Sequence, residues 1–400
     1  MLDVRKDFLY YDKENTIYFD NSSTTLKPKQ VIENANLNNI YSFNANRGIN
    51  SNVVNLSKKI EIVREKVAKF INADSKEEIA FTTGATESSN LFAYSYCLNN
   101  LKDKDEILMC DKDHKSTILP ILNINNHLKS KGINVVIKNI EIDHEGDYNE
   151  DNLFSKITDK TKIVILTHIH NIYGLEMNIE YIVENIRKIN KNIVIVLDLS
   201  QSIGHIDVNI KKLDIDIAYF SGHKMMALQG VGIIYIKKEI QKYFTPFLIG
   251  GNYKEKEIIN ISDIKQLECG TKNYSNILSL GDSIDYINKI GIDNIEQHIY
   301  NLTRYLYDKL KENKKIIFNK GINNCKCAIG YGIISFNIEK IDSSEVSQIL
   351  EEYNILVRTG DFCNTSNHEN YIRVSLYIYN TLEEIDKFIE VINYLLSEIN

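Results

Sequence analysis

The sequence contains no tryptophan and has only 3 prolines and 6 cysteines among its 400 residues. So few prolines, together with 18 glycines, leave little room for flexible linkers or low-complexity tails. No apolar run approaches the length needed to cross a membrane, and the charged N-terminal residues lack the apolar core of a signal peptide. The formal net charge of -7 shows no excess of positive charge of the kind that binds nucleic acid. We therefore expect a cytoplasmic protein that binds neither nucleic acid nor membranes.

The cysteines do not form a pattern that predicts disulfides or a metal site. Cytoplasmic thiols stay reduced, so we expect buried small residues or reactive thiols. Cys325 and Cys327 form a tight pair, but without a second pair or a nearby histidine they do not make a zinc site. We expect no metal ligands among the six cysteines, which are Cys97, Cys110, Cys269, Cys325, Cys327 and Cys363.

Apolar residues, which make up 43% of the chain, recur in short blocks between helical stretches. Residues 56–73 predict an amphipathic helix, because their apolar side chains fall on one face. The runs that follow are apolar on both faces, which is typical of a mostly parallel sheet covered by helices on each side, an α/β fold. The seven predicted strands are residues 79–83, 107–110, 135–137, 163–166, 193–197, 217–220 and 233–236.

From about residue 260 the pattern changes to that of a smaller α+β domain. We place the large domain at residues 15–258 and the small domain at residues 1–14 and 259–400. The predicted elements of the small domain are a strand at 333–336, a helix capped by Asp342, strands at 355–358 and 372–376, and a final helix opened by a capping box at Thr381.

Three predicted strand ends carry residues suited to one chemistry. Lys224 follows a strand and could form a Schiff base, although most lysines are solvated surface charges. Asp198 closes another strand and could pair with a protonated pyridine nitrogen, or it could simply cap a helix. The turn at residues 83–87 contains glycine and offers N–H groups to a phosphate, or it is a plain turn. Ligands of such sheets bind beyond the carboxyl ends of the strands, so these residues can share one crevice.

Short motifs recur in a fixed order along nearly the whole chain. They are YFDNSST at 18–24, NANRG at 44–48, GATE at 84–87, DH at 113–114, HIHNIYG at 168–174, DLSQS at 198–202, SGHKM at 221–225, ECGT at 268–271, RTGDFC at 358–363 and RVS at 373–375. In this order they closely resemble the class V aminotransferase-like enzymes of fold type I, specifically the cysteine desulfurases and selenocysteine lyases. The resemblance implies a homodimeric enzyme that depends on pyridoxal 5′-phosphate.

The resemblance assigns cofactor-binding roles to matching residues. Lys224 would bind the cofactor covalently, His114 would stack on its pyridine ring, and Asp198 would pair with the ring nitrogen. Gln201 would contact the phenolic oxygen, with Asn171 nearby. The phosphate would be held by Ala85, Thr86, Ser221 and His223 and, from the neighbouring subunit, Thr271.

The resemblance also assigns the substrate and the nucleophile. Arg373 would clamp the α-carboxylate of L-cysteine, a task suited to a planar bidentate donor, with Asn171 and Asn50 beside the substrate. Cys363 falls at the position where the family forms a persulfide, and nearby Arg358 could favour its thiolate. The implied reaction gives L-alanine and a persulfide that passes to a sulfur-acceptor protein, with L-selenocysteine as another substrate.

The sequence departs from the family pattern around the substrate. The common RTGHHC reads RTGDFC, so Asp361 and Phe362 replace two histidines, and an aspartate two residues before the nucleophile disfavours its thiolate. The segment Phe362-Cys363-Asn364-Thr365 instead resembles molybdenum-cofactor sulfurases. Asn50, His170 and Lys272 replace a histidine, a serine and a proline of the family. These changes spare the cofactor residues and leave the substrate and the sulfur acceptor open.

Three other functions remain to be weighed against a cysteine desulfurase. A relative with the same cofactor could catalyse C–S or C–Se lysis, epimerisation or transamination, and Cys363 would then be dispensable. A non-catalytic homologue that binds a sulfur-transfer partner is disfavoured by the retention of Lys224, Asp198, His114 and Arg373 together. A nicotinamide dehydrogenase is disfavoured because no GxGxxG follows the early strands.

Overall fold

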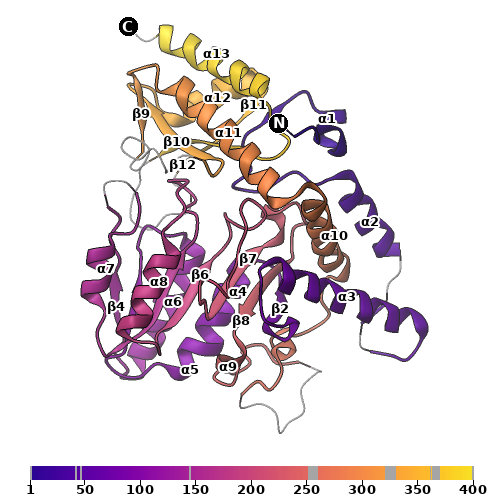
Figure 1. Cartoon of the computed structure of the whole chain (residues 1–400), viewed down its shortest axis with the longest axis vertical. Coiled ribbons are helices and arrows are strands. Elements are labelled where there is room, and N and C mark those ends of the chain that lie inside the picture. The colour runs from indigo at the N-terminus through magenta and orange to yellow at the C-terminus, as the bar shows by residue number, and fades with distance from the viewer. Residues whose placement is uncertain are drawn as a thin grey trace.

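The computed structural model describes residues 2–40, 43–45, 47–143, 146–250, 260–319, 330–360, 362 and 370–398 (Figure 1). Cys363 and Asp361, named above, lie outside these residues. Among the described residues, no helix combines the length and the apolar character that a membrane span requires.

A seven-stranded sheet forms the centre of the larger part of the molecule and confirms the predicted α/β fold. Strands β7, β6, β5, β3 and β4 run parallel to one another, whereas β8 runs antiparallel to both β2 and β7. The order across the sheet is β2 (Ile79–Thr82), β8 (Gly232–Ile236), β7 (Ile217–Ser221), β6 (Val194–Asp198), β5 (Thr161–Thr167), β3 (Glu106–Met109) and β4 (Val136–Asn139).

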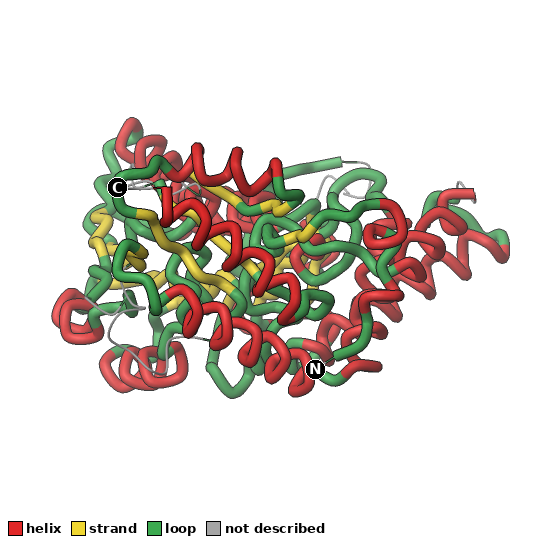
Figure 2. The backbone as a smooth tube through the Cα atoms, turned by 90° about the horizontal axis from the view of Figure 1, so that it is seen from above, coloured by secondary structure: helices red, strands yellow, loops and turns green. Residues whose placement is uncertain are grey.

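Helices cover both faces of this sheet, as Figure 2 shows from above. Successive residues of a strand point to opposite faces, so Ile195 and Leu197 join one apolar core and Val196 joins the other. This explains why the central strands read as nearly continuous apolar runs, whereas the edge strand β4 does not. The helices that precede and flank the strands are α2 (Lys29–Ile40), α3 (Ser51–Phe70), α4 (Ala85–Leu91), α5 (Leu98–Asn100), α6 (Lys115–Ser130), α7 (Glu150–Lys156), α8 (Ile179–Ile189) and α9 (Lys238–Gln241).

A second, four-stranded antiparallel sheet has the order β12-β13-β10-β9 and packs on α11, α12 and α13 around its own apolar core. Helix α10, which precedes these strands, packs instead into the core of the large sheet. The domain boundaries given above stay a prediction. The elements are β9 (Ile316–Phe318), β10 (Ile333–Ile338), β12 (Arg358–Gly360), β13 (Tyr371–Ser375), α10 (Tyr274–Ile290), α11 (Ile292–Leu310), α12 (Ser343–Glu352) and α13 (Leu382–Glu398).

Local capping residues explain where several elements begin. The predicted caps of α12 and α13 are confirmed: the Asp342 carboxylate accepts from the Ser344 N–H at 2.8 Å, and the Thr381 hydroxyl accepts from the Glu384 N–H at 3.3 Å. Helix α3 begins earlier than predicted, because the Asn50 side chain accepts from the N–H of Val53 at 3.0 Å.

The prediction of one continuous strand at 355–358 is wrong, because the structure has two short strands there. Strand β11 (Ile355–Leu356) pairs in parallel with β1 (Ile17–Tyr18) near the N-terminus. Strand β12 begins at Arg358 and pairs with β13. The break at Val357 lets the chain pass from one sheet to the other, which an apolar run alone does not reveal.

The turn after β2 lies against β8 at a position where only glycine fits. A Cβ atom at Gly232 would come within 2.4 Å of the Gly84 Cα, and backbone atoms cannot yield as a side chain does. Gly84 directly precedes α4, so this close approach determines where α4 begins.

The loop after β3 is anchored beneath the sheet edge by a buried carboxyl group. The Tyr148 hydroxyl donates to both oxygens of Asp113 at 3.2 Å and accepts from the Thr167 N–H at 2.8 Å. Burial, followed by the charge of Asp198, raises the pKa of Asp113 to about 8. Asp113 is therefore protonated at neutral pH.

We expect Gly232→Ala to lower the free energy of unfolding by about 1–3 kcal/mol, because the added methyl group overlaps the Gly84 backbone. Denaturant unfolding followed by circular dichroism measures the change. Gly48→Ala is the control, since its Cβ would meet only ordinary contacts at 3.7 Å or more. Equal stabilities of the two variants would contradict the close approach.

We expect Asp113→Asn to stabilise the protein increasingly as pH rises. The folded protein holds the Asp113 proton up to about pH 8, whereas the unfolded chain releases it near its ordinary pKa of 3.8, so wild-type stability falls with rising pH across this window. The variant lacks that loss. Urea unfolding at several pH values measures the difference, with exposed Asp3→Asn as control. A difference independent of pH from 5 to 9 would show that Asp113 is ionised in the folded protein.

Candidate active site

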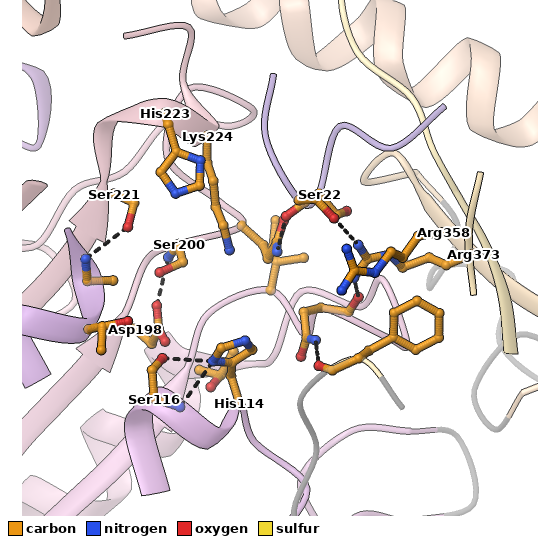
Figure 3. A pocket seen from close by; sticks show the side chains of 18 residues that line it. Ser22, His114, Ser116, Asp198, Ser200, Ser221, His223, Lys224, Arg358 and Arg373 are labelled. Carbon is orange, nitrogen blue, oxygen red and sulfur yellow. Dashed lines mark hydrogen bonds between the residues drawn. The ribbon is translucent and has the colours of Figure 1, made fainter. Parts of the chain in front are cut away.

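A cavity of about 270 Å³ lies at the carboxyl ends of the strands of the large sheet, facing the smaller sheet (Figure 3). Most of the residues predicted for the site line it together, although they come from distant parts of the chain. These are Ala85, Thr86, His114, Asn171, Asp198, Gln201, Ser221, His223, Lys224 and Arg373. The other lining residues are Ser22, Ser23, Ser116, Thr167, Ile169, Ser200, Arg358 and Phe362.

Lys224 ends a short 3-10 turn, Gly222–Lys224, that directly follows β7. Figure 3 shows its side chain extending into the cavity between the surrounding polar groups. Thr25 reinforces the turn by donating its N–H to the carbonyl of His223 at 3.0 Å. The amine is therefore presented from a held backbone, as a lysine that bonds covalently to a ligand requires.

Asp198 ends β6, and its carboxylate is held at both oxygens. The Ser200 N–H donates to one oxygen at 2.8 Å, and the Thr117 hydroxyl donates to the other at 2.9 Å. Thr117 in turn accepts from the Tyr219 hydroxyl at 3.0 Å. Only 4% of Asp198 is exposed, so the carboxylate has a fixed direction within the cavity.

His114 stands at the N-terminus of α6 and is neutral. Its Nδ1 accepts from the Ser116 N–H at 3.1 Å, which places the proton of the neutral ring on Nε2. Burial, followed by the positive charge of Lys224, lowers its pKa to about 4. A neutral imidazole whose Nδ1 is occupied by the backbone is suited to stacking rather than to carrying charge.

A polar corner whose chemistry suits a phosphate group, called the phosphate corner below, lies where the turn before α4 meets the end of β7. The Ala85 N–H donates to the Ser221 hydroxyl at 2.8 Å, and Thr86 adds a second hydroxyl on the first turn of the helix. Beside them, Nδ1 of His223 is buried and has no hydrogen-bond partner within the described part of the chain. Backbone N–H groups, hydroxyls and an unsatisfied imidazole nitrogen fit a phosphate group.

Gln201 and His170 fix the loops around the cavity. The Gln201 amide donates to the Ser22 carbonyl at 3.1 Å. Nδ1 of His170 accepts from the N–H of Ile172 at 3.2 Å, while Nε2 lies 3.0 Å from the Lys112 carbonyl. Because one nitrogen faces an N–H group and the other a carbonyl, His170 must be the neutral Nε2–H tautomer. It joins the loop of His114 to the loop of Asn171.

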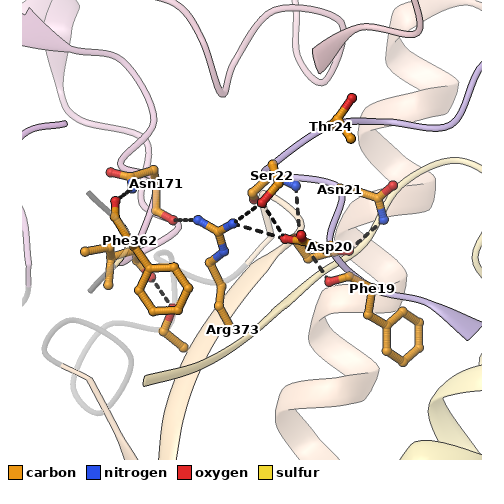
Figure 4. A network of polar contacts seen from close by, with 12 residues as sticks. Phe19, Asp20, Asn21, Ser22, Thr24, Asn171, Phe362 and Arg373 are labelled. Atoms are coloured by element: carbon orange, nitrogen blue, oxygen red, sulfur yellow. Dashed lines mark hydrogen bonds and ion pairs between the residues drawn. The ribbon is translucent and has the colours of Figure 1, made fainter. Parts of the chain in front are cut away.

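Arg373 lies on β13 and reaches the cavity from the small sheet (Figure 4). Its Nη1 donates to the Asn171 carbonyl at 3.1 Å, and Nη2 donates to Asp20 at 3.2 Å and to Ser23 at 3.1 Å. The guanidinium carbon lies 4.6 Å from the centre of the Phe362 ring. The guanidinium is thus held from three loops, and Asp20 is already paired with one of its nitrogens.

Residues 20–25 connect the two sheets at the cavity. The amide of Asn21 donates to the Ser375 carbonyl at 2.6 Å, directly beside β13. The Ser22 N–H donates to the Ser375 hydroxyl at 2.9 Å, while Thr25 contacts the turn of Lys224 as described. The sequence motif YFDNSST contains this connection, although sequence reasoning assigned no site role to Ser22 or Ser23.

Thr271 and Asn50 do not line this cavity in the single chain. Thr271 is exposed, and its hydroxyl accepts from the Asn44 amide at 3.4 Å. Asn50 caps α3 instead, so its role beside a substrate stays a prediction, as does that of Thr271. Cys363, the predicted nucleophile, lies outside the described residues, immediately after Phe362.

Comparisons with known proteins agree with this geometry. The model of the family described as aminotransferase class-V matches residues 17–388. A probable cysteine desulfurase of Borreliella burgdorferi is 33% identical, with 99% of this chain and 96% of the relative covered. A probable cysteine desulfurase of Pyrococcus abyssi is 34% identical over 99% of this chain and 98% of the relative.

The solved structures agree as well. The apo cysteine desulfurase of Thermococcus onnurineus superimposes with a TM-score of 0.90 at 31% identity, and the match covers 99% of this chain and 98% of that one. A family match over nearly the whole chain and a cavity that gathers the family's motif residues lead to the same conclusion. This chain belongs to the aminotransferase class-V family.

Proposed function

We propose that the protein is a cysteine desulfurase, which removes sulfur from L-cysteine and yields L-alanine and a persulfide on Cys363. One observation carries the proposal: Lys224, Asp198, His114 and Arg373 surround a single cavity. Full-length relatives that bear this name support it. L-Selenocysteine differs from L-cysteine only in one atom and is the related substrate.

We propose pyridoxal 5′-phosphate as the cofactor, because the residues present fit each part of it. When bound, this cofactor supplies an electron sink for the bonds around the substrate Cα. Lys224 would hold it covalently, Asp198 would keep a proton on its ring nitrogen, and neutral His114 would cover the ring. The corner with the unsatisfied His223 nitrogen would hold the phosphate, with Ala85, Thr86 and Ser221.

The residues around the cavity bind the substrate and transfer its Cα proton. Arg373 binds the α-carboxylate of the substrate and thereby fixes which bond at Cα faces Lys224. The Lys224 amine then takes the Cα proton and returns it during turnover. Gln201 would orient the phenolic oxygen of the cofactor, with Asn171 nearby. Only 4% of Arg373 is exposed, and this burial strengthens its attraction to the carboxylate.

Cys363 carries out the transfer itself. Its thiolate attacks the sulfur of L-cysteine, and an S–S bond forms as the substrate C–S bond breaks. The electron pair of the broken bond remains on the carbon side, where Cβ takes up one proton and becomes the methyl group of L-alanine. The sulfur stays on Cys363 as a persulfide until a sulfur-acceptor protein removes it.

We also propose that the protein works as a homodimer. Thr271 is exposed, and Lys272 lies 3.8 Å from Glu87 on α4, so residues 270–272 run along the surface beside the phosphate corner. Apolar side chains exposed on α2 and α3, Leu37, Ile40, Val54 and Ile62, support a partner that covers them. The cytoplasmic location stays a prediction from the sequence.

We expect light scattering to give twice the mass of the chain, and Ile62→Glu to shift the protein towards the monomer because a buried charge opposes association. Exposed Tyr394→Glu on α13 serves as control. A wild-type protein that is monomeric at micromolar concentration would contradict the homodimer.

We expect Cys363→Ala to lose alanine and sulfide release from L-cysteine by at least about 100-fold in the presence of a reductant, because no thiolate remains to accept sulfur. The variant should keep the yellow colour of the bound cofactor. Cys269→Ala, which changes the partly exposed cysteine of the ECGT motif, should behave like wild type.

Either of two results would change the assignment. Equal turnover by Cys363→Ala would make Cys363 a bystander and favour a C–S lyase. Wild-type protein that leaves L-cysteine unchanged would point to another substrate, for which the replacements Asp361, Phe362 and Asn50 would be the cause.

A further inference from the structure

Phe362 forms one wall of the cavity directly against Arg373 (Figure 4). We propose that Phe362 is a specificity-determining residue, whose ring keeps the Arg373 guanidinium oriented and shielded from water so that the site selects ligands that carry an α-carboxylate. The proposal rests on the proposed function, since it concerns the same substrate site. It concerns a position where the sequence departs from the histidine of the resembling family.

The contact between the two side chains is close and buried. The guanidinium carbon lies 4.6 Å from the ring centre, within the range at which a cation is attracted to an aromatic face. Only 5% of Phe362 and 4% of Arg373 are exposed. Desolvation strengthens such a contact, because water no longer competes for the cation.

The ring is fixed from its other side by an apolar cluster. Phe362 packs with Ile172, Tyr173 and Leu175 of the loop that follows β5, and with Tyr371 on β13. These contacts stabilise the ring in the position where it faces the guanidinium.

The backbone of Phe362 supports a functional contact at this point. Its φ angle is +46°, a left-handed conformation that a residue with a bulky side chain rarely adopts. The Phe362 carbonyl accepts from the Asn171 amide at 3.2 Å, and the Asn171 carbonyl accepts from Arg373 at 3.1 Å. The three residues thus form a closed ring of contacts that holds an unfavourable backbone conformation in place.

The contacts around Arg373 leave carboxylate binding dependent on Phe362. Asp20 and Ser23 hold one edge of the guanidinium, and the Asp20 carboxylate competes for its charge. A solvent-exposed guanidinium already paired with Asp20 would gain little binding free energy from a second carboxylate. With its face covered by the Phe362 ring, the guanidinium loses competing water on that side, so a carboxylate that reaches it interacts more strongly.

The test compares ligands that differ only in the carboxylate. L-Cysteine and cysteamine share the thiol and the amine, but cysteamine has no carboxylate, and L-alanine has the carboxylate without the thiol. Binding of each to the cofactor-loaded enzyme is followed by the change in cofactor absorbance, and turnover of L-cysteine gives KM and kcat. The variants are Phe362→Leu, which keeps apolar bulk, and Phe362→Tyr, which keeps the ring.

We expect Phe362→Leu to raise the KM for L-cysteine and the Kd for L-alanine about tenfold, with kcat changed less than about threefold, because a leucine offers no aromatic face. Its affinity for cysteamine should stay at the wild-type value. Phe362→Tyr should restore both affinities for the carboxylate ligands. Phe154→Leu, a remote phenylalanine on α7, is the control for loss of a ring elsewhere.

Other outcomes would overturn the inference. Equal losses for L-alanine and cysteamine would mean that the ring only packs the site, as would losses in Phe362→Tyr equal to those in Phe362→Leu. Unchanged affinities in Phe362→Leu would show that Arg373 needs no shield. A wild type that binds L-alanine but does not turn over L-cysteine would defeat the proposed function alone, because the L-alanine arm still decides the role of Phe362. Binding of neither would defeat both.

Discussion

The site depends on one constraint of the large sheet: the strands that supply the chemistry must all end at the same edge. Strand β8 runs antiparallel to both β2 and β7, so β2 and β7 run in the same direction although they are not neighbours. The turn after β2 is thereby brought to the edge where β6 ends at Asp198 and where the turn of Lys224 follows β7. Gly232, at the start of β8, allows the backbone there to approach Gly84, and this contact joins the phosphate corner to the lysine turn.

Around this edge several buried titratable side chains are neutral, and only a few carry charge. Burial lowers the pKa of His114, His170 and His223 to about 4 each, and raises that of Asp113 to about 8. The groups are neutral in the folded protein at physiological pH, so they orient loops without competing for a charged ligand. The ion pairs at the site are left to arginine, whose charge no physiological pH removes.

Much of the fold and the site could be predicted because strands and strand ends are local features. Burial on both faces of the sheet shows each central strand as an apolar run, and Asp198 and Lys224 come at or shortly after the ends of such runs. The contacts that refine the site are not local. The stacking of Phe362 on Arg373 depends on the register of β12 with β13, and the neutral tautomer of His170 depends on a carbonyl 58 residues away. Neither leaves a signal in composition or periodicity.

The short segment at residues 20–25 has a consequence for how the protein folds during its synthesis. It joins the turn of Lys224 to Ser375 on β13, while β1 just before it pairs with β11. These N-terminal residues are synthesised early, but they can form their contacts only after the C-terminal part of the chain has been synthesised. Contacts of such sequence separation form slowly, after the loss of entropy in closing a long chain. On the ribosome the sheet can assemble early, but the lysine and the arginine meet only at the end of synthesis, so a nascent or truncated chain presents no finished site.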